Sequence, residues 1–434
     1  MTNDDLDDED YVAQDLPVPD ETPDDLAPVY QQPVPIGGIP RQFKPWHRPR
    51  KQFVRRKQWV NSFGDLLDHL CGVDNKRTEV NYIGLPGSDL LDVRLFSEEC
   101  AKRGLLLRYL GFDRTAIGDS PESSHLNLSR DELFKSGHIH RESIVMPDEF
   151  LELADVNSMA YANANRLSFD VVNLDFCGSA TNQPGGKGNI YQALLNLMRV
   201  QWKRDEPWVL LLTSAFDRDG QGGNGVQNAA KFVGALEERL AACEKALTEA
   251  RKAFGAGSDA ALPELESCGD EVYSRWLLLA FISWLSTIGR QVRSARFKVI
   301  SVFSYRLSKN HPAPNMFSLA IRVTPYDLAV HDPASLIPAP ELPDECAELE
   351  QQAARMGSVK DVDTALRADE TLFEGMRSEM ADLLADLRYD RQAYLNSDFS
   401  KRIEDSEVTA ARVAPQRVAE TVAVQQAETE SLGA

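Results

Sequence analysis

The sequence lacks the cysteine pairs of small zinc-binding modules and the leader of an exported chain. Six cysteines are scattered over 434 residues with no CxxC pair, so neither a zinc knuckle nor a zinc ribbon is expected. The acidic N-terminus has neither the basic stretch nor the apolar stretch of a signal peptide. These absences predict a cytoplasmic protein whose cysteines are reduced thiols.

Long hydrophobic runs and several catalytic motifs are also missing. The longest apolar run, residues 276–288, is interrupted by two serines and is shorter than the roughly 20 residues of a membrane span, so it predicts a buried helix. Lys187 lies between glycines but has no Ser or Thr after it, which argues against a P-loop ATPase or GTPase. No GxSxG elbow of a serine hydrolase is present, and His138 and His140 lack a third ligand, so no metal site is expected.

The formal net charge of −20 is unevenly distributed. Residues 1–30 carry eleven acids and no Lys or Arg, whereas residues 41–57 carry eight Lys or Arg and no acid. We expect residues 1–40 to be a disordered acidic tail, because they hold few large apolar residues. The tail is either simply solvated or folds over the basic segment and competes there with nucleic acid.

Residues 41–78 are predicted to form a basic, aromatic helical arm. Cationic side chains would contact phosphates while aromatic faces stack on bases, so DNA or RNA is a candidate partner of residues 41–57. The alternative is that the aromatic residues anchor the arm and the bases stay solvated. The candidate nucleic-acid contacts are Arg48, Arg50, Lys51, Arg55, Arg56 and Lys57.

Residues 79–330 alternate between strand and helix patterns, which predicts an α/β fold with a mostly parallel, doubly wound sheet. The last two strands have only a loop between them and should form an antiparallel hairpin. Residues 114–140 are expected to be a surface excursion. Strands are expected at 78–83, 105–112, 169–174, 208–212, 297–305 and 316–323, and helices at 92–103, 151–162, 189–201, 226–247 and 273–292.

The C-terminal part is predicted to be a helical extension. A Pro-rich linker begins at residue 331, and helices follow to residue 404. Apolar residues of this region step by three and four, but over too few heptads for a coiled coil, so we expect the helices to pack on the domain or to offer a surface to a protein partner. Residues 405–434 are predicted to be disordered.

Candidate site residues follow the predicted strands, because ligands of open parallel sheets bind beyond the carboxyl ends of the strands. Gly84 and Gly87 follow the first strand, Asp113 the second, Asp148 the third, and Asp175 the strand 169–174. The two glycines could instead serve an ordinary tight turn, and Asp113 could cap its own loop. Asp175 is the strongest candidate, since a carboxylate directly after a buried strand is held at the sheet edge.

The ordered set of motifs resembles class I S-adenosylmethionine-dependent methyltransferases. YIGLPGSD (82–89) is similar to a degenerate first glycine motif, and LRYLGFD (107–113) to a second strand that ends in a ribose-binding acid. VVNLDFCG (171–178) is similar to the fourth-strand motif that borders the methyl acceptor. Residues 297–307 and 316–326 look like the terminal hairpin of that family. YIGLPG and LDFCG are also similar to the three-Cys-motif partner family of bacterial mobile and defence loci.

The resemblance implies S-adenosylmethionine as a cofactor and nucleic acid or protein as the acceptor. In this interpretation Gly84, Gly87 and Asp148 belong to the cofactor site, Asp113 holds the ribose hydroxyls, and Asp175 is the catalytic residue that orients or deprotonates the acceptor. The glycine-rich loops 184–189 and 220–225 would close over the site.

Two features of the first motif depart from the family pattern. No acid stands near Tyr82, and Leu85 and Pro86 interrupt the glycines. These departures favour a second hypothesis, a non-catalytic Rossmann-like module that binds nucleic acid or a partner protein in a bacterial defence or mobile-element system.

Overall fold

The structure is a computed structural model that describes residues 41–72, 77–116, 120–181, 189–218, 225–257, 260–326, 334, 336 and 344–406. The tail predicted at 1–40, nearly all of the tail predicted at 405–434, and most of the loops 184–189 and 220–225 lie outside these residues. The chain divides into the units Met1–Gln42 and Phe43–Ala434. The elements below all belong to the second unit.

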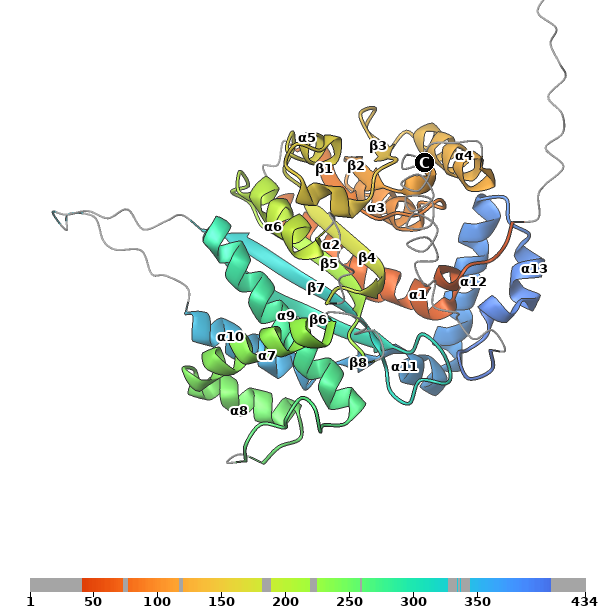
Figure 1. Cartoon of the computed structure of the whole chain (residues 1–434). Helices are drawn as coiled ribbons and strands as arrows, with labels where there is room; N and C mark the ends of the chain where they lie inside the picture. Colours follow the sequence, from red (N-terminus) through yellow and green to blue (C-terminus); the bar gives the residue numbers. More distant parts are fainter. Residues whose placement is uncertain are drawn as a thin grey trace, which may run out of the picture. The chain divides into compact units, whose positions relative to one another are not determined.

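Eight strands form one sheet in the order β3-β2-β1-β4-β5-β7-β6-β8 (Figure 1). Among the described strands, only β7 runs against the others: it is antiparallel to both β5 and β6, and every other pair is parallel. The predicted α/β fold with a terminal antiparallel hairpin is therefore confirmed. The strands are β1 Glu79–Gly84, β2 Leu106–Phe112, β3 Ile144–Met146, β4 Val171–Ser179, β5 Trp208–Ala215, β6 Ala295–Tyr305, β7 Met316–Pro325 and β8 Lys360–Asp361.

One face of the sheet packs against the helices that follow β3, β4 and β5 and against α10. The apolar faces of these helices and of alternate strand positions form a single core. The apolar run of the sequence lies in α9, and 72% of its most hydrophobic window is buried inside the protein, as predicted for a core helix. The elements are η4 Phe150–Ala154, α5 Met159–Ala164, α6 Ile190–Gln201, α7 Gly225–Ala241, α8 Glu244–Ala253, α9 Asp270–Val292 and α10 Glu345–Met356.

The opposite face packs against the N-terminal arm, the helices around β2, and the part of the C-terminal extension that follows α10. The arm is continuously helical from residue 49 to residue 70, and Phe53, Trp59 and Phe63 are at most 1% exposed. In Figure 1 the arm helix α1 lies beside α12 of the extension, and the two are in contact. The elements are η1 Pro45–His47, α1 Pro49–Val54, η2 Arg55–Val60, α2 Asn61–Leu70, α3 Leu91–Ala101, η3 Arg114–Ala116, α4 Pro121–Lys135, α11 Val362–Ala368, α12 Glu370–Asp386, α13 Arg391–Asn396 and η5 Asp398–Ser400.

Several predicted elements differ from the structure. The excursion predicted at 114–140 contains the helix α4, which starts at a Ser120 cap with Pro121 in its first turn; its apolar face is narrow, so periodicity did not reveal it. The helix predicted at 226–247 is two helices that break at Ala242 and Cys243. The strand predicted at 169–174 continues to Ser179, so Asp175 lies within β4.

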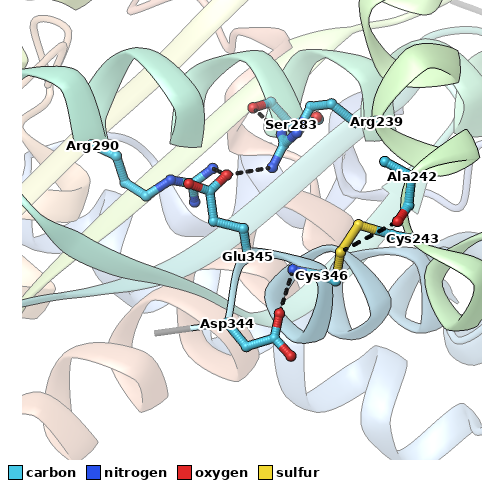
Figure 2. Close-up of a disulfide and its surroundings, with 8 residues drawn as sticks. All are labelled: Arg239, Ala242, Cys243, Ser283, Arg290, Asp344, Glu345 and Cys346. Atoms are coloured by element: carbon cyan, nitrogen blue, oxygen red, sulfur yellow. Dashed lines mark hydrogen bonds and ion pairs between the residues drawn. A yellow bond between two sulfur atoms is a disulfide. The ribbon is translucent and has the colours of Figure 1, made fainter. Parts of the chain in front are cut away.

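The cysteine prediction is wrong for two of the six residues. Cys243 and Cys346 form a disulfide with their Cα atoms 5.3 Å apart (Figure 2), while Cys71, Cys100 and Cys268 are free thiols. The two bonded cysteines are 103 positions apart in the sequence. The two cysteines come together because α10 packs against α8. The spacing of cysteines along the chain does not predict this packing.

Candidate functional site at the carboxyl edge of the sheet

The sheet brings the predicted site residues to one edge. Gly84 ends β1 and lies in register between Gly111 on β2 and Asn173 on β4. Asp113 directly follows β2, and Asp175 lies on β4 opposite Thr213. Because β1, β2 and β4 are parallel neighbours, their carboxyl ends form a common rim.

Asp148 lies beyond the end of β3, the last strand on that side of the sheet. It is partly exposed. Its position at the carboxyl end of a parallel strand agrees with the predicted location of a site residue, although β3 is separated from β1 by β2.

Gly84 is covered by a side chain of its own strand. A Cβ at this position would overlap the hydroxyl of Tyr82 and the carbonyl oxygen of Asn173. The Tyr82 hydroxyl donates to Asp92 at 2.5 Å, and the Asn173 amide donates to the same carboxyl oxygen at 2.8 Å. Burial and Asp92 raise the pKa of Tyr82 well above its ordinary value. The missing side chain of Gly84 thus makes room for a phenol.

The turn after β1 is folded against β2. A Cβ on Gly111 would lie 2.8 Å from Cγ of Pro86, so the proline ring rests directly on the β2 backbone. Gly87 has a φ of +62°, the left-handed conformation that favours glycine in a turn. Gly111 therefore permits close packing of the turn, and the conformation of Gly87 agrees with the tight turn that the sequence analysis gave as the alternative to a ligand site.

Asp113 is engaged within its own loop. One carboxylate oxygen accepts hydrogen bonds from the backbone nitrogen and the hydroxyl of Thr115, at 2.8 and 2.7 Å. Asp113 is partly exposed. The local cap considered from the sequence is therefore present, and the second carboxylate oxygen is the one placed to meet a further donor.

Asp175 is paired with the N-terminal arm. Lys51 Nζ donates to Asp175 Oδ1 at 2.5 Å and lies 3.4 Å from the Tyr305 hydroxyl. The Lys51 ammonium also lies 4.8 Å from the centre of the Trp59 ring, a cation–π distance. The Lys51 side chain is 7% exposed and that of Asp175 is 23% exposed. A cation from this chain therefore occupies the position beside the predicted catalytic carboxylate.

Asp89 is the centre of a buried network that the sequence did not single out. Its carboxylate accepts from Trp46 Nε1 at 3.2 Å, from His47 Nε2 at 3.0 Å and from the Tyr389 hydroxyl at 2.8 Å. His125 Nε2 lies 3.2 Å away. Burial alone would raise the pKa of Asp89, but His47, His125 and Trp46 hold it well below its ordinary value. The only sequence signal was the position of Asp89 in the glycine turn, because its partners come from remote segments.

The predicted solvent-facing basic arm is not what the structure contains. Four of its six candidate contacts are at most 7% exposed. Their charges are balanced inside the protein, as in the Arg48–Asp398 and Arg50–Asp363 pairs at 3.6 Å. The apolar stripe of the arm drives its burial, and the acids of the sheet edge and of the extension compensate the bases. The four are Arg48, Arg50, Lys51 and Arg55.

Only two of the candidate nucleic-acid contacts remain near the surface. Arg56 is partly exposed and pairs with Glu98 and Glu379, and Lys57 is exposed. Nucleic-acid binding by this arm stays a prediction, and within the described residues Arg56 and Lys57 are the members of the set placed to make it.

Two surface depressions among the described residues are lined neither by Gly84 nor by Asp175. One lies between α1, α11, α12 and residues 401–404, next to Arg50 and Phe373. The other lies at the opposite ends of the strands, beside Trp208 and Pro325.

Comparisons with known proteins give a family and a distant structural likeness. A family model described as PP_RS20740-like matches residues 40–399. No curated protein matches the chain in sequence. A solved structure from Listeria monocytogenes, described as a class I S-adenosylmethionine-dependent methyltransferase, is 11% identical over 71% of this chain and 78% of that chain, with a TM-score of 0.28. A likeness this distant carries no information about activity or cofactor.

Proposed function

The chain belongs to the PP_RS20740-like family, and we propose that it is a non-catalytic binding component built on a methyltransferase-like α/β scaffold. The observation that carries the proposal is the filling of the carboxyl edge by the chain's own side chains. Tyr82 covers Gly84, and Pro86 covers Gly111. The arm adds Lys51 at Asp175.

The residues at this edge do not fit S-adenosylmethionine. A cofactor at a parallel-sheet edge needs backbone that a ligand can approach closely, which is the purpose of a glycine-rich turn. Here a phenol and a pyrrolidine ring already lie against the two glycines that face each other across β1 and β2. One oxygen of Asp113, the predicted ribose ligand, is committed to Thr115.

Charge supports a protein rather than a nucleic acid as the partner. The formal net charge is −20, with eleven acids in the first 30 residues, and the bases at positions 48, 50, 51 and 55 are buried. An acidic surface repels phosphate and attracts basic protein surfaces. The described residues do not indicate which surface would bind the partner protein.

Titration calorimetry with S-adenosylmethionine tests the proposal. We expect no saturable heat from the folded full-length chain up to millimolar cofactor. The Tyr82→Phe variant, which keeps the ring but loses the hydroxyl, should also give none, because the ring still covers Gly84. Saturable heat from the wild-type chain, abolished by Asp113→Ala, would overturn the proposal.

Methyl transfer is the second candidate function, and one observation favours it. Asp113 and Asp175 are both partly exposed at the same edge of a sheet with a single reversed strand. Saturable binding of S-adenosylmethionine in the titration above would support methyl transfer instead. In that case we expect Asp175→Asn to lose turnover and to keep its affinity for the cofactor.

A further inference from the structure

The Cys243–Cys346 disulfide joins two helix beginnings. Cys243 is the N-cap residue of α8, and Cys346 is the second residue of α10. A thiolate at the N-terminus of a helix is stabilised by the helix dipole and by free backbone N–H groups. Opening this disulfide therefore releases thiolates where the fold favours the anion, and a stabilised thiolate is the better leaving group in exchange.

The charges around the disulfide are largely paired with one another (Figure 2). Glu345 lies 3.5 Å from Arg239 and 3.3 Å from Arg290. Arg290 also pairs with Glu348. Asp344 accepts from the backbone nitrogen of Cys346 at 2.9 Å, so its charge caps α10. These three carboxylates on or beside α10 are thus engaged with guanidinium groups or with the helix end.

Access to the two sulfurs is unequal. Cys346 is partly exposed, whereas Cys243 is 9% exposed and contributes to the core beside α8. An incoming thiolate therefore reaches the sulfur of Cys346, and the sulfur of Cys243 is the one that leaves, at the N-cap of α8.

We propose that the Cys243–Cys346 disulfide is a thiol–disulfide exchange site whose co-substrate is a dithiol reductant. One reductant thiolate attacks Sγ of Cys346, the Sγ–Sγ bond breaks, and Cys243 leaves as a thiolate that takes up a proton from water. The second reductant thiol, once deprotonated, attacks the mixed disulfide and releases Cys346 as a thiolate. The dithiol leaves as a disulfide, so two electrons pass to the protein.

Reduction loosens the attachment of the C-terminal extension. α10 is the first helix of that extension, and Glu348 and Gln351 on α10 accept from the backbone nitrogens of Phe297 and Val299 at the start of β6. The disulfide is the covalent tie between α10 and the α7–α8 corner. Exchange therefore acts on the packing of α8 and α10 and leaves β1 and β4, on the other side of β5 and β7, unchanged.

Thiol trapping of the native, full-length chain tests the proposal. The air-oxidised protein is incubated with dithiothreitol without denaturant, alkylated, and analysed by peptide mass spectrometry. We expect Cys243 and Cys346 to be blocked before reduction and labelled after it, with amide exchange rising in α8 and α10 only. Labelling of these cysteines before reduction, or labelling after reduction only in denaturant, would overturn the proposal.

Thermal denaturation supplies a second readout. The melting temperature of the wild-type chain should fall on reduction to that of Cys243→Ser, and Cys243→Ser should not respond to the reductant. Cys268→Ser, which removes a free and partly exposed thiol, is the matched control and should keep the full response. A wild-type melting temperature that is the same with and without dithiothreitol contradicts the proposal.

Discussion

The side chain of Tyr82 changes the interpretation of Gly84, from a ligand-binding glycine to a packing glycine. In sequence, Gly84 suggests backbone that a ligand can approach, yet the phenol two residues earlier on the same strand face lies over it. The hydroxyl is held by Asp92, whose pKa is raised by burial in spite of its hydrogen bond from Tyr82. Tyr82, which fills the edge, is therefore held by the backbone of β1 and by the hydrogen bond of its hydroxyl to Asp92.

Removing the Tyr82 hydroxyl should destabilise the fold without opening a large cavity. Tyr82→Phe leaves the buried Asp92 with one donor fewer, and we expect the free energy of unfolding to fall by about 1–3 kcal/mol, measured by urea denaturation. Tyr273→Phe, at a buried tyrosine of the other core, is the control and should change it by less. Equal losses in the two variants would show that Asp92 does not depend on Tyr82.

His47 makes stability depend on pH. It is fully buried, its Nδ1 accepts from the backbone nitrogen of Lys44 at 3.1 Å, and its Nε2–H donates to Asp89. Burial lowers the pKa of His47 in spite of Asp89. The unfolded chain therefore takes up a proton near pH 6.5 while the folded chain resists it, so stability is present above that pH and is lost as the pH falls below it.

The prediction for His47 concerns how steeply the free energy of unfolding changes with pH. The wild-type free energy of unfolding should decline between about pH 6.5 and pH 5, and His47→Gln should have a lower but flatter profile over that range. His138→Gln, at an exposed histidine, should keep the wild-type slope. A wild-type slope that survives in His47→Gln would assign the proton uptake to another group.

At the scale of elements, the N-terminal arm differs most from its sequence appearance. Its eight Lys and Arg within residues 41–57 suggested a surface for phosphate, but the apolar stripe of the same helix decides its position. The aromatic side chains of the arm are buried, and the neighbouring basic side chains are buried with them. The bases pair there with three acids: Asp175, Asp363 and Asp398. The acids that pair with these bases lie more than 100 positions away in the sequence. The sequence therefore could not show the pairing.

The Lys51–Asp175 pair should contribute to holding the arm on the sheet. Lys51→Met removes the cation that is paired with the partly buried Asp175, and we expect a loss of about 3 kcal/mol in the free energy of unfolding, measured by urea denaturation. Adding Asp175→Asn removes the uncompensated charge and should restore part of that loss. Lys57→Met, at an exposed lysine of the same arm, should stay within about 0.5 kcal/mol of wild type; an equal effect at both positions would refute the role of the pair.

The sequence predicted the sheet better than its surroundings. Runs such as residues 169–174 and 208–212 are mostly apolar, which is typical of strands buried on both faces. Alternation with helices predicted parallel strands, and the last strand–loop–strand predicted the terminal hairpin. The helix α4, the break at Ala242 and the network around Asp89 were missed because each depends on weak local signals or on distant partners. The candidate residues do lie at one edge of the sheet, but the sequence did not show which side chains cover that edge.

At the scale of the whole molecule, charge predicts poor binding of nucleic acid. With a net charge of −20 and four of the six candidate bases buried, we expect fluorescence anisotropy to give dissociation constants for DNA and RNA weaker than about 10⁻⁴ M at physiological salt. Arg56→Glu with Lys57→Glu should leave these values unchanged. Tight wild-type binding that falls with salt, and that the double variant weakens, would restore the arm as a nucleic-acid surface.

The contacts of Asp89 and His47 with the end of the fold set an order of events during synthesis. Tyr389 reaches Asp89 across 300 positions, and Tyr394 donates to the carbonyl oxygen of His47 across 347. A nascent chain on the ribosome therefore cannot complete the surroundings of its own beginning until almost all of it has emerged. Stalled chains that end before residue 389 should be cut by protease within residues 43–60, whereas released full-length chains should resist.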